Sequence, residues 1–476
     1  MMNLAGEKKG MSFATGLKIL FLIILILPSN AGAEPDYSPL IEAVFAYNLK
    51  VHESSLEDGS YRAEEGFLRI PPEVAQSFGM KAYVDKDYLK SRDLFEQAEA
   101  FLEDAINGMS TGAQENASGE YVAMVSRSAC LYQKTMRSAE ELLKNYRATL
   151  MVNKDERFDK SKCSVLLQDL IKKALKRYGR NLRDALGQVY NQCLGIEPLD
   201  GYPLTSENVG FVNYVFNCYV RKAKPEDLKA FDLDKFGGKE FERSPGTLKD
   251  FLGKTESRYF SLLEPFLKRY GDGKYAAEPL LFLALMRQES RFDPKAVSYV
   301  GAAGITQIMP STGKLLGMST IFSPPYFEEA REFMLKERRL KAKAMALISK
   351  PEEYCVEDDA RRACQEMQQA IAFREKWVAS YRRYRLELLQ EARDDRLNPQ
   401  KAIEGGYRLF AELLKQQKGD ISLALAAYNA GSRAVKKYNG LPPYPETVSY
   451  RNRVLRYYRE YLKRAGLPDS GLRKGG

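Results

Sequence analysis

The sequence predicts an all-α protein with at least two domains. Apolar residues recur at spacings of three and four along most of the chain, whereas the strict alternation of a strand is scarce. Clusters of Gly, Pro, Asp and Asn separate these helical stretches. The chain has 476 residues, more than a single hydrophobic core usually organises, so a second domain is expected.

The N-terminus has the pattern of a signal peptide over residues 1–33. Basic residues precede the apolar run 19–27, Pro28 ends that run, and Ala31-Gly32-Ala33 offers a cleavage site of small residues. The run is about half of the roughly 20 residues that a membrane-spanning helix needs, which favours cleavage over a retained anchor. The mature chain is therefore expected to be exported, to begin near Glu34, and to have no transmembrane span.

Residues 34–245 are expected to form a helical N-terminal domain whose role the sequence does not define. Helical periodicity is clear at 121–152, 164–194 and 207–223. No repeat of fixed period is visible, so a solenoid is not expected. A segment with Gly and Pro at 236–245 is the expected linker to the second domain.

The second domain is expected over residues 246–476. Within it, residues 319–396 are highly charged, with Glu, Lys and Arg at helix spacing. A proline and the pair Cys355 and Cys364 lie near the middle of this stretch, so we expect a helical insertion of two long helices joined by a tip. Trp377, the only tryptophan, is expected to pack between those helices.

The cysteines and the single histidine limit which kinds of cross-link, catalytic triad and metal site the chain can form. An even number of cysteines in an exported chain favours disulfides, although reduced, buried cysteines are the alternative. Cys355 and Cys364 could staple the tip, and the other four allow three connectivities. His52 is the only histidine and has no cluster of ligands around it, so histidine triads and histidine-rich metal sites are nearly excluded. The six cysteines are Cys130, Cys163, Cys193, Cys218, Cys355 and Cys364.

The net charge of +10 favours an anionic partner but does not identify one. Lys and Arg alternate with Asp and Glu along most helical stretches, which is typical of solvated helix faces. A dedicated nucleic-acid groove would concentrate the basic residues on one face, so no nucleic-acid partner is expected.

Glu289 is the first candidate catalytic residue. It closes a helix predicted over residues 278–290, with Pro279 at the first helical position. Leu285 and Met286 precede it by four and three residues, so its carboxyl shares a helix face with large apolar groups. Desolvation there would favour the protonated form and allow Glu289 to act as a general acid. The alternative is a glutamate at the solvent-exposed end of the helix.

Four motifs follow in an order that resembles the soluble lytic murein transglycosylase family, over about residues 259–462. The small residues of the second motif would let the backbone approach a ligand closely. The amide of Gln307 can both donate and accept, as sugar hydroxyl and acetamido groups require. The motifs are Glu289-Ser290, Ser298-x-x-Gly301-Ala302-x-Gly304-Ile305-x-Gln307-Ile308-Met309-Pro310, Ala427-Tyr428-Asn429-Ala430-Gly431 and Glu446-Thr447-x-x-Tyr450.

The resemblance implies a lysozyme-like α fold with Glu289 as the only catalytic acid/base. It also implies that Ser298 lies near the N-acetyl group of the substrate, that Tyr428 helps to orient Glu289, and that Tyr450 packs behind them. The residues implied to line the glycan groove are Gln307, Met309, Tyr428, Asn429 and Glu446. Alternatives remain for these positions: Met309 and Tyr450 as core residues, Ser298 as a turn residue, Gln307 as an ordinary loop residue, and residues 427–431 as a helix end with Gly431 in a left-handed cap.

This sequence departs from the family pattern at several positions. Thr306 stands where Met is usual, Ala402 where Asn is usual, and Arg451 where Val is common. The insertion at 319–396 replaces what is usually a short connection. It is expected either to reshape one end of the groove or to offer a docking surface.

The resemblance implies cleavage of the β-1,4 bond between N-acetylmuramic acid and N-acetylglucosamine in peptidoglycan, leaving a 1,6-anhydromuramoyl end. One carboxyl suffices because the substrate supplies its own acetamido and hydroxyl groups, and no cofactor or metal is required. The implied location is the periplasm or cell envelope of a bacterium. The expected partners are peptidoglycan glycan strands and, through the N-terminal domain or the insertion, other envelope proteins. Two alternatives stay open: a lysozyme-type hydrolase with Asp293 or Glu446 as second acid, and a non-catalytic peptidoglycan-binding scaffold.

Overall fold

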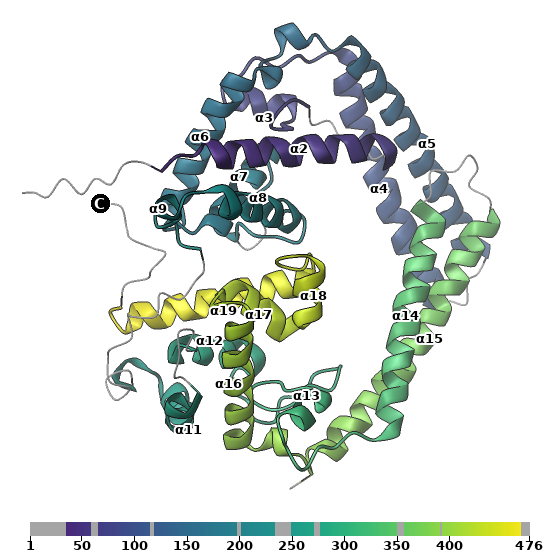
Figure 1. Ribbon diagram of the computed structural model, residues 1–476. Coiled ribbons are helices and arrows are strands. Elements are labelled where there is room, and N and C mark those ends of the chain that lie inside the picture. The colour runs from purple at the N-terminus through teal and green to yellow at the C-terminus, as the bar shows by residue number, and fades with distance from the viewer. Residues whose placement is uncertain are drawn as a thin grey trace, which may run out of the picture. The chain divides into compact units, whose positions relative to one another are not determined.

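In the computed structural model, helices are the only named regular elements among the described residues, apart from isolated β-bridges, so the all-α prediction is confirmed (Figure 1). The expected signal peptide, the linker at 236–245, the side chain of His52 and the tip with Cys355 lie outside the described residues. Within the described ranges, no helix combines the length and apolar character needed to cross a membrane. The described residues are 35–58, 65–114, 119–197, 201–233, 249–270, 277–349, 357–390 and 393–467.

The first half of the chain contains a long helical hairpin flanked by shorter helices. The stretch 164–194 forms two helices, because Gly179 and Arg180 adopt positive φ of 58° and 68° and Asn181 caps the next helix through its side chain. The elements are α2 (Ser38–Asp58), α3 (Pro72–Ser77), α4 (Lys86–Gln114), α5 (Gly119–Thr149), η1 (Val152–Lys154), η2 (Glu156–Phe158), α6 (Lys160–Arg177), α7 (Leu182–Leu194), α8 (Val209–Lys222) and α9 (Pro225–Leu228).

The second half of the chain also contains a long helical hairpin flanked by shorter helices. Its central helix, α12, is fully buried from Leu280 to Met286 and packs against α19 and α11. The charged stretch expected to hold two helices contains α14 and α15. The elements are η4 (Lys249–Phe251), α11 (Lys254–Tyr270), α12 (Pro279–Ser290), α13 (Pro310–Leu315), α14 (Pro325–Ser349), α15 (Glu357–Leu388), η5 (Asp395–Leu397), α16 (Pro399–Gln416), α17 (Ile421–Ala430), α18 (Ser432–Lys437) and α19 (Pro445–Arg464).

The hairpin α14–α15 packs against the hairpin α4–α5 through one shared apolar cluster. Figure 1 shows the ends of the two hairpins side by side. Seven of the buried residues are alanines, and such small side chains let helices approach closely. The insertion therefore serves as a docking surface for the first half of the chain. The buried members are Ala105, Met109, Ala113, Val122, Val125, Ala129, Ala344, Leu347, Ile348, Ala360, Ala363, Cys364, Met367 and Ala370.

Buried ion pairs form a second contact between the halves. Arg183 of α7 donates to both carboxylate oxygens of Asp420, at 3.2 and 2.7 Å. In the opposite direction, Arg451 of α19 donates to Asp184 at 2.6 Å. All four side chains are at most 6% exposed, so loss of either arginine would remove charge compensation from a buried aspartate. Arg451, a departure from the family pattern, thus has a structural role.

Two asparagines make reciprocal hydrogen bonds at the same contact. Nδ2 of Asn213, in α8, donates to the backbone carbonyl of Leu441 at 2.8 Å. Nδ2 of Asn452, in α19, donates to the backbone carbonyl of Leu204 at 2.9 Å. Each half therefore offers an asparagine to a loop carbonyl of the other half.

The five described cysteines are free, so the disulfides expected among Cys130, Cys163, Cys193 and Cys218 do not form in the structure. Cys163 and Cys193 are instead buried in α6 and α7, where burial raises the pKa of each thiol to about 12. They follow the alternative of small, reduced core residues. Cys364 lies in the cluster shared by the hairpins, and its expected partner, Cys355, lies outside the described residues.

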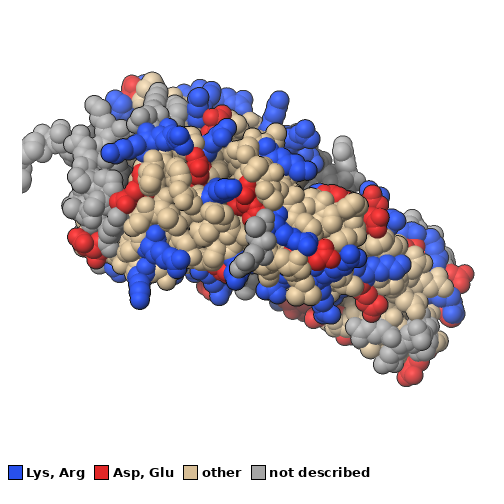
Figure 2. All heavy atoms as spheres, turned by 90° about the horizontal axis from the view of Figure 1, so that it is seen from below, with Lys and Arg blue, Asp and Glu red and all other residues tan. Residues whose placement is uncertain are grey.

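Basic and acidic side chains are interleaved on the face shown in Figure 2, as the sequence predicts. Pairs at a spacing of four residues occur on the insertion helices, such as Lys341 with Glu337 at 2.6 Å and Arg361 with Glu357 at 2.8 Å. Such pairs are typical of solvated helix faces.

Candidate active site

Helix α12 places Glu289 at the edge of a buried core. The helix starts at Pro279, and the side chain of Glu278 accepts hydrogen bonds from two backbone N–H groups of the first turn, at 2.9 and 2.6 Å. The backbone turns left-handed at Arg291, with φ of 54°, and ends the helix there. Glu289 therefore lies in the last turn, half-buried, with the apolar body of α12 behind it.

The carboxyl of Glu289 is poised to carry a proton at neutral pH. Burial raises the pKa of Glu289 to about 8, and the negative charge of Glu446 raises it further. The hydroxyl of Tyr450 opposes this shift by donating to Oε1 of Glu289 at 2.6 Å. Burial outweighs the hydrogen bond, so Glu289 is predominantly protonated at pH 7.

The structure assigns the two tyrosines differently from the family resemblance. Tyr450, expected to pack behind the site, holds Glu289 directly. Tyr428, expected to orient Glu289, donates its hydroxyl to the backbone carbonyl of Thr306 at 2.8 Å. Tyr428 still lies close to Glu289, whose charge joins burial in raising the pKa of the Tyr428 hydroxyl. A backbone carbonyl is available at any residue, which is why Thr306 can replace the usual Met without loss of this contact.

Thr306 and Ala402, two of the departures from the family pattern, contact each other. The hydroxyl of Thr306 donates to the backbone carbonyl of Ala402 at 2.8 Å. Both residues are fully buried. The hydrogen bond satisfies the one polar group that Thr brings into this core.

The loop after α12 is fixed by its own hydrogen bonds. Ser298 accepts a bond on Oγ from the backbone N–H of Ala302 at 3.0 Å, which makes it a turn residue in this structure. Gln307 adopts φ of 48°, and its Nε2 donates to the carbonyls of Ala296 at 3.0 Å and Gly304 at 2.9 Å. The Gln307 amide therefore holds the loop together as well as lying where the resemblance implies a groove.

Arg396 organises this loop and was not predicted. Its side chain is fully buried and donates to the carbonyls of Gly301 at 2.7 Å and Ile308 at 3.1 Å. Asp394 accepts two bonds from the guanidinium, at 2.9 and 2.7 Å, and the hydroxyl of Tyr384 lies at 3.0 Å. Arg396 therefore ties the glycine-rich loop to α15. The only signal in the sequence is an Asp-x-Arg triplet inside a stretch full of charges.

The remaining candidates lie on the edge formed by α17 and α19. The Oδ1 of Asn429 accepts a hydrogen bond from the hydroxyl of Thr447 at 2.7 Å, which joins the two helices. Glu446 is exposed in the first turn of α19, close enough to act on the pKa of Glu289. Gly431 ends α17 with φ of 87° and ψ of 149°, a conformation open to glycine but outside the left-handed helical region expected.

Met309 shares a pocket of about 130 Å³ with the insertion. Phe327, Glu328 and Arg331 of α14 line this pocket together with Met309 of the loop. The insertion therefore forms part of the wall of this pocket, in addition to docking against the first half of the chain. Trp377 is not in this pocket; its Nε1 donates to Glu337 of α14 at 2.6 Å, as a helix-packing role requires.

Comparison with known proteins identifies this part of the chain. The profile of the Transglycosylase SLT domain family matches residues 267–331 and 378–447. Membrane-bound lytic murein transglycosylase C of Actinobacillus pleuropneumoniae is 44% identical over 68 residues, which are 14% of this chain and 17% of that protein. The chain thus spans less than a fifth of the length of that curated relative.

Two solved structures are similar at low sequence identity. The lytic transglycosylase Slt of Pseudomonas aeruginosa, solved as an inactive mutant, matches 83% of this chain and 72% of its own with 13% identity and a TM-score of 0.27. The 70 kDa soluble lytic transglycosylase SLT70 of Escherichia coli matches 79% and 64% with 14% identity and a TM-score of 0.29. The gap between the two matched segments begins in α14, after residue 331, and ends in α15, before residue 378. The match to the family model therefore shows that the chain carries a transglycosylase SLT domain, interrupted by the α14–α15 hairpin.

Proposed function

We propose that this protein is an exported lytic transglycosylase that cleaves the bond between N-acetylmuramic acid and N-acetylglucosamine in peptidoglycan. The observation that carries the proposal is Glu289, whose pKa is raised to about 8 while Tyr450 fixes its carboxyl at 2.6 Å. An acid that is protonated at neutral pH and held in one orientation is what cleavage of a glycosidic bond requires. The signal-peptide pattern of residues 1–33 would deliver the chain to the envelope, where peptidoglycan lies.

Glu289 would act twice in one turnover. It first gives its proton to the glycosidic oxygen, so that the bond to C1 of the muramic sugar breaks while the acetamido group of that sugar assists. The Glu289 carboxylate then takes the proton of the C6 hydroxyl of the same sugar, whose oxygen attacks C1 and closes the 1,6-anhydro ring. The proton balance is zero, and no water is consumed. The Tyr450 hydroxyl stabilises the carboxylate between the two steps because it already donates to Oε1.

The placement of the other carboxyls favours this reaction over hydrolysis. A hydrolase needs a second carboxyl across the scissile bond from the acid. Glu278 is buried at the far end of α12, about 16 Å away at 1.5 Å per residue, and it caps the helix. Asp293 is exposed and accepts a bond from the backbone N–H of Lys295 at 2.8 Å. Among the described residues, Glu446 is the carboxyl whose charge acts on Glu289, and it too is exposed.

The remaining candidates would shape the glycan groove. Ser298 and Gln307 would set the loop that meets the acetamido group, and Met309 would lie toward the end that α14 closes. Tyr428 and Asn429 would form the opposite edge, since their side chains bond Thr306 and Thr447.

Digestion of purified sacculi, followed by mass spectrometry of the soluble products, tests the proposal. We expect anhydromuramoyl ends with the wild-type protein and no soluble product with Glu289→Gln. Glu446→Gln should retain anhydro products, which makes it the matched control for loss of a nearby carboxyl. Products with hydrated reducing ends would instead establish a hydrolase. Binding of sacculi without any release, equal in wild type and Glu289→Gln, would establish a scaffold.

A further inference from the structure

The first half of the chain repeats the loop that surrounds the candidate active site. The antiparallel bridge of Glu65 with Ile70 has its counterpart in the bridge of Ala303 with Ile308. A six-residue helix follows each bridge, α3 in the first half and α13 in the second. The backbone conformations also agree, with φ of 81° at both Gly66 and Gly304. In sequence the two segments read EGFLRIPPEVAQSFGM at 65–80 and AGITQIMPSTGKLLGM at 303–318.

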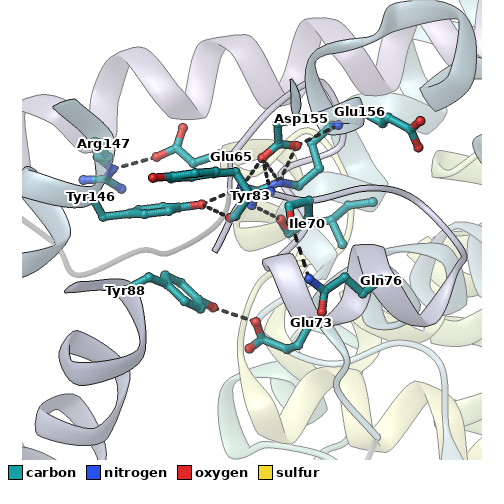
Figure 3. Close-up of polar contacts among 12 residues, drawn as sticks. Glu65, Ile70, Glu73, Gln76, Tyr83, Tyr88, Tyr146, Arg147, Asp155 and Glu156 are labelled. Atoms are coloured by element: carbon teal, nitrogen blue, oxygen red, sulfur yellow. Dashed lines mark hydrogen bonds and ion pairs between the residues drawn. The ribbon is translucent and has the colours of Figure 1, made fainter. Parts of the chain in front are cut away.

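The arginine that ties this loop to a hairpin also occurs twice. Arg157 is fully buried and bonds Asp155, the carbonyl of Ile70 at 3.0 Å and the hydroxyl of Tyr146 at 2.7 Å. Figure 3 shows that Asp155, Ile70 and Tyr146 lie close to one another. Arg396 bonds Asp394, Ile308 and Tyr384 in the same way. Each arginine lies in a short 3₁₀ helix after a long hairpin, and an 18-residue helix follows, α6 or α16.

The contact between the last helices is repeated as well. Asn208, at the start of α8, donates from Nδ2 to Oδ1 of Asn191 at 3.0 Å. Thr447, at the start of α19, donates to Oδ1 of Asn429 at 2.7 Å. Tyr190 precedes Asn191 as Tyr428 precedes Asn429. The first half is therefore a second copy of the SLT-type fold, with its hairpin at the same place.

In the first copy, Tyr47 occupies the position of the catalytic acid. Ser290, the residue after Glu289, donates to the carbonyl of Ile305 at 2.9 Å. Asn48, the residue after Tyr47, donates to the carbonyl of Phe67 at 3.0 Å, and Phe67 is the counterpart of Ile305 in the repeated loop.

The partner of the acid is replaced too. Phe211 follows Asn208 by three residues, as Tyr450 follows Thr447, and its ring lies 5.2 Å from that of Tyr47. In the first copy, a contact between two aromatic rings therefore replaces the hydrogen bond that Tyr450 donates to Glu289 in the second copy.

A pocket of about 280 Å³ opens at this position, and none of the described residues that line it carries a carboxyl group. Aromatic rings from α2, α7 and α8 form part of its walls, and aliphatic side chains such as Val51 complete them. The polar side chains of the lining include an asparagine, an arginine and two tyrosines, the arginine being the counterpart of Gln307 at the positive-φ position of the loop. The residues that matter here are Tyr47, Asn48, Arg69, Tyr190, Leu194 and Phe211.

We infer that this pocket binds an N-acetylated sugar of a glycan strand and holds it uncleaved. The inference rests on the proposed function, since it takes its ligand class from the substrate of the second copy. Aromatic and aliphatic walls suit the C–H faces and acetamido methyl group of such a sugar, while Asn48 and Arg69 offer donors to its oxygens. Without an acid at the position of Glu289, the bound strand is not cut.

Titration calorimetry on the full chain with Glu289→Gln tests the inference. The probe is a soluble tetrasaccharide of alternating N-acetylglucosamine and N-acetylmuramic acid, which this variant does not cleave. We expect two fragments bound per chain. Addition of Leu194→Trp on α7 or Val51→Trp on α2, each of which places a large side chain in the lining of the pocket, should reduce this to one. Val165→Trp on α6, where the side chain is 71% exposed, is the matched control and should leave two.

Hydrogen exchange on the same chain without the tryptophan substitutions gives a reading that does not depend on how those variants fold. The tetrasaccharide should slow exchange in α7 and α2 as well as around Glu289. A single bound fragment with no slowing in α7 and α2, or two fragments bound to a folded Leu194→Trp and Val51→Trp, overturns the inference. Cleavage of sacculi by the wild type tests the proposed function separately. Slower hydrogen exchange in the first copy without any cleavage of sacculi would refute only the proposed function.

Discussion

Replacement of Glu289 by Gln should make the protein more stable, by an amount that depends on pH. The pKa of Glu289 is about 8 in the folded chain, against an ordinary value of 4.5 that applies once the chain unfolds. Between these values the folded state keeps a proton that the unfolded state releases. Stability therefore falls as pH rises from about 4.5 to about 8, by about 1.4 kcal/mol per pH unit from this group alone. Below pH 4.5 both states are protonated and the contribution is constant.

The glutamine variant removes that pH dependence while keeping the main contact. Its amide oxygen can still accept the hydrogen bond that Tyr450 donates, and it cannot ionise. We expect Glu289→Gln to match the wild type near pH 4 and to exceed it by about 3 kcal/mol at pH 7, with a plateau near 5 kcal/mol above pH 8 as the upper bound.

Urea unfolding followed by circular dichroism, at several pH values and constant ionic strength, measures this difference. Glu332→Gln on α14 is the matched control, because it makes the same chemical change at an exposed side chain. Its difference from the wild type should be small and constant across the pH range. If the curves for Glu289→Gln and the wild type run parallel between pH 5 and 8, the raised pKa of Glu289 is refuted.

Three further substitutions probe the site and its support. Gly304→Ala should destabilise the chain by about 3 kcal/mol or more, because a Cβ there would lie 1.8 Å from the carbonyl oxygen of Arg396; an unchanged urea midpoint would contradict this. Tyr450→Phe removes the bond that lowers the pKa of Glu289, so the alkaline limb of the pH–rate profile should move to higher pH while the maximal rate falls; a shift to lower pH would show that the hydroxyl acts otherwise. Ala363→Asp buries a charge in the cluster shared by the hairpins and should cost about 3–5 kcal/mol, with faster hydrogen exchange in α4, α5, α14 and α15; protection equal to wild type would mean that the cluster does not hold the hairpins together.

The sequence predicts the helices and the acid because both depend on local patterns. The apolar run before Glu289 defines α12, and Pro279 with a capping glutamate defines its start. The acceptor to which a tyrosine hydroxyl donates, by contrast, does not depend on the local sequence. Tyr428 and Tyr450 both lie near Glu289, and only the packing of α17 on α19 decides which of them donates to it.

The features that the sequence did not reveal depend on backbone geometry. Arg396 uses carbonyl groups that every residue carries, so its partners leave no mark in the sequence. The internal repeat leaves little mark in the sequence for the same reason, since bonds to main-chain atoms are retained while the side chains at Tyr47 and Glu289 differ in kind. The number of cysteines led to a wrong prediction of disulfides, because Cys163 and Cys193 are instead buried as small apolar residues.

The reciprocal bonds of Asn213 and Asn452 have the form of an interface between identical subunits, in which each copy gives what it receives. In a dimer encoded by one gene, every substitution appears in both subunits, so the loss of the acid would silence both sites. Joining the copies in one chain removes that constraint. Each half can then change by itself, and Tyr47 in one copy can coexist with Glu289 in the other.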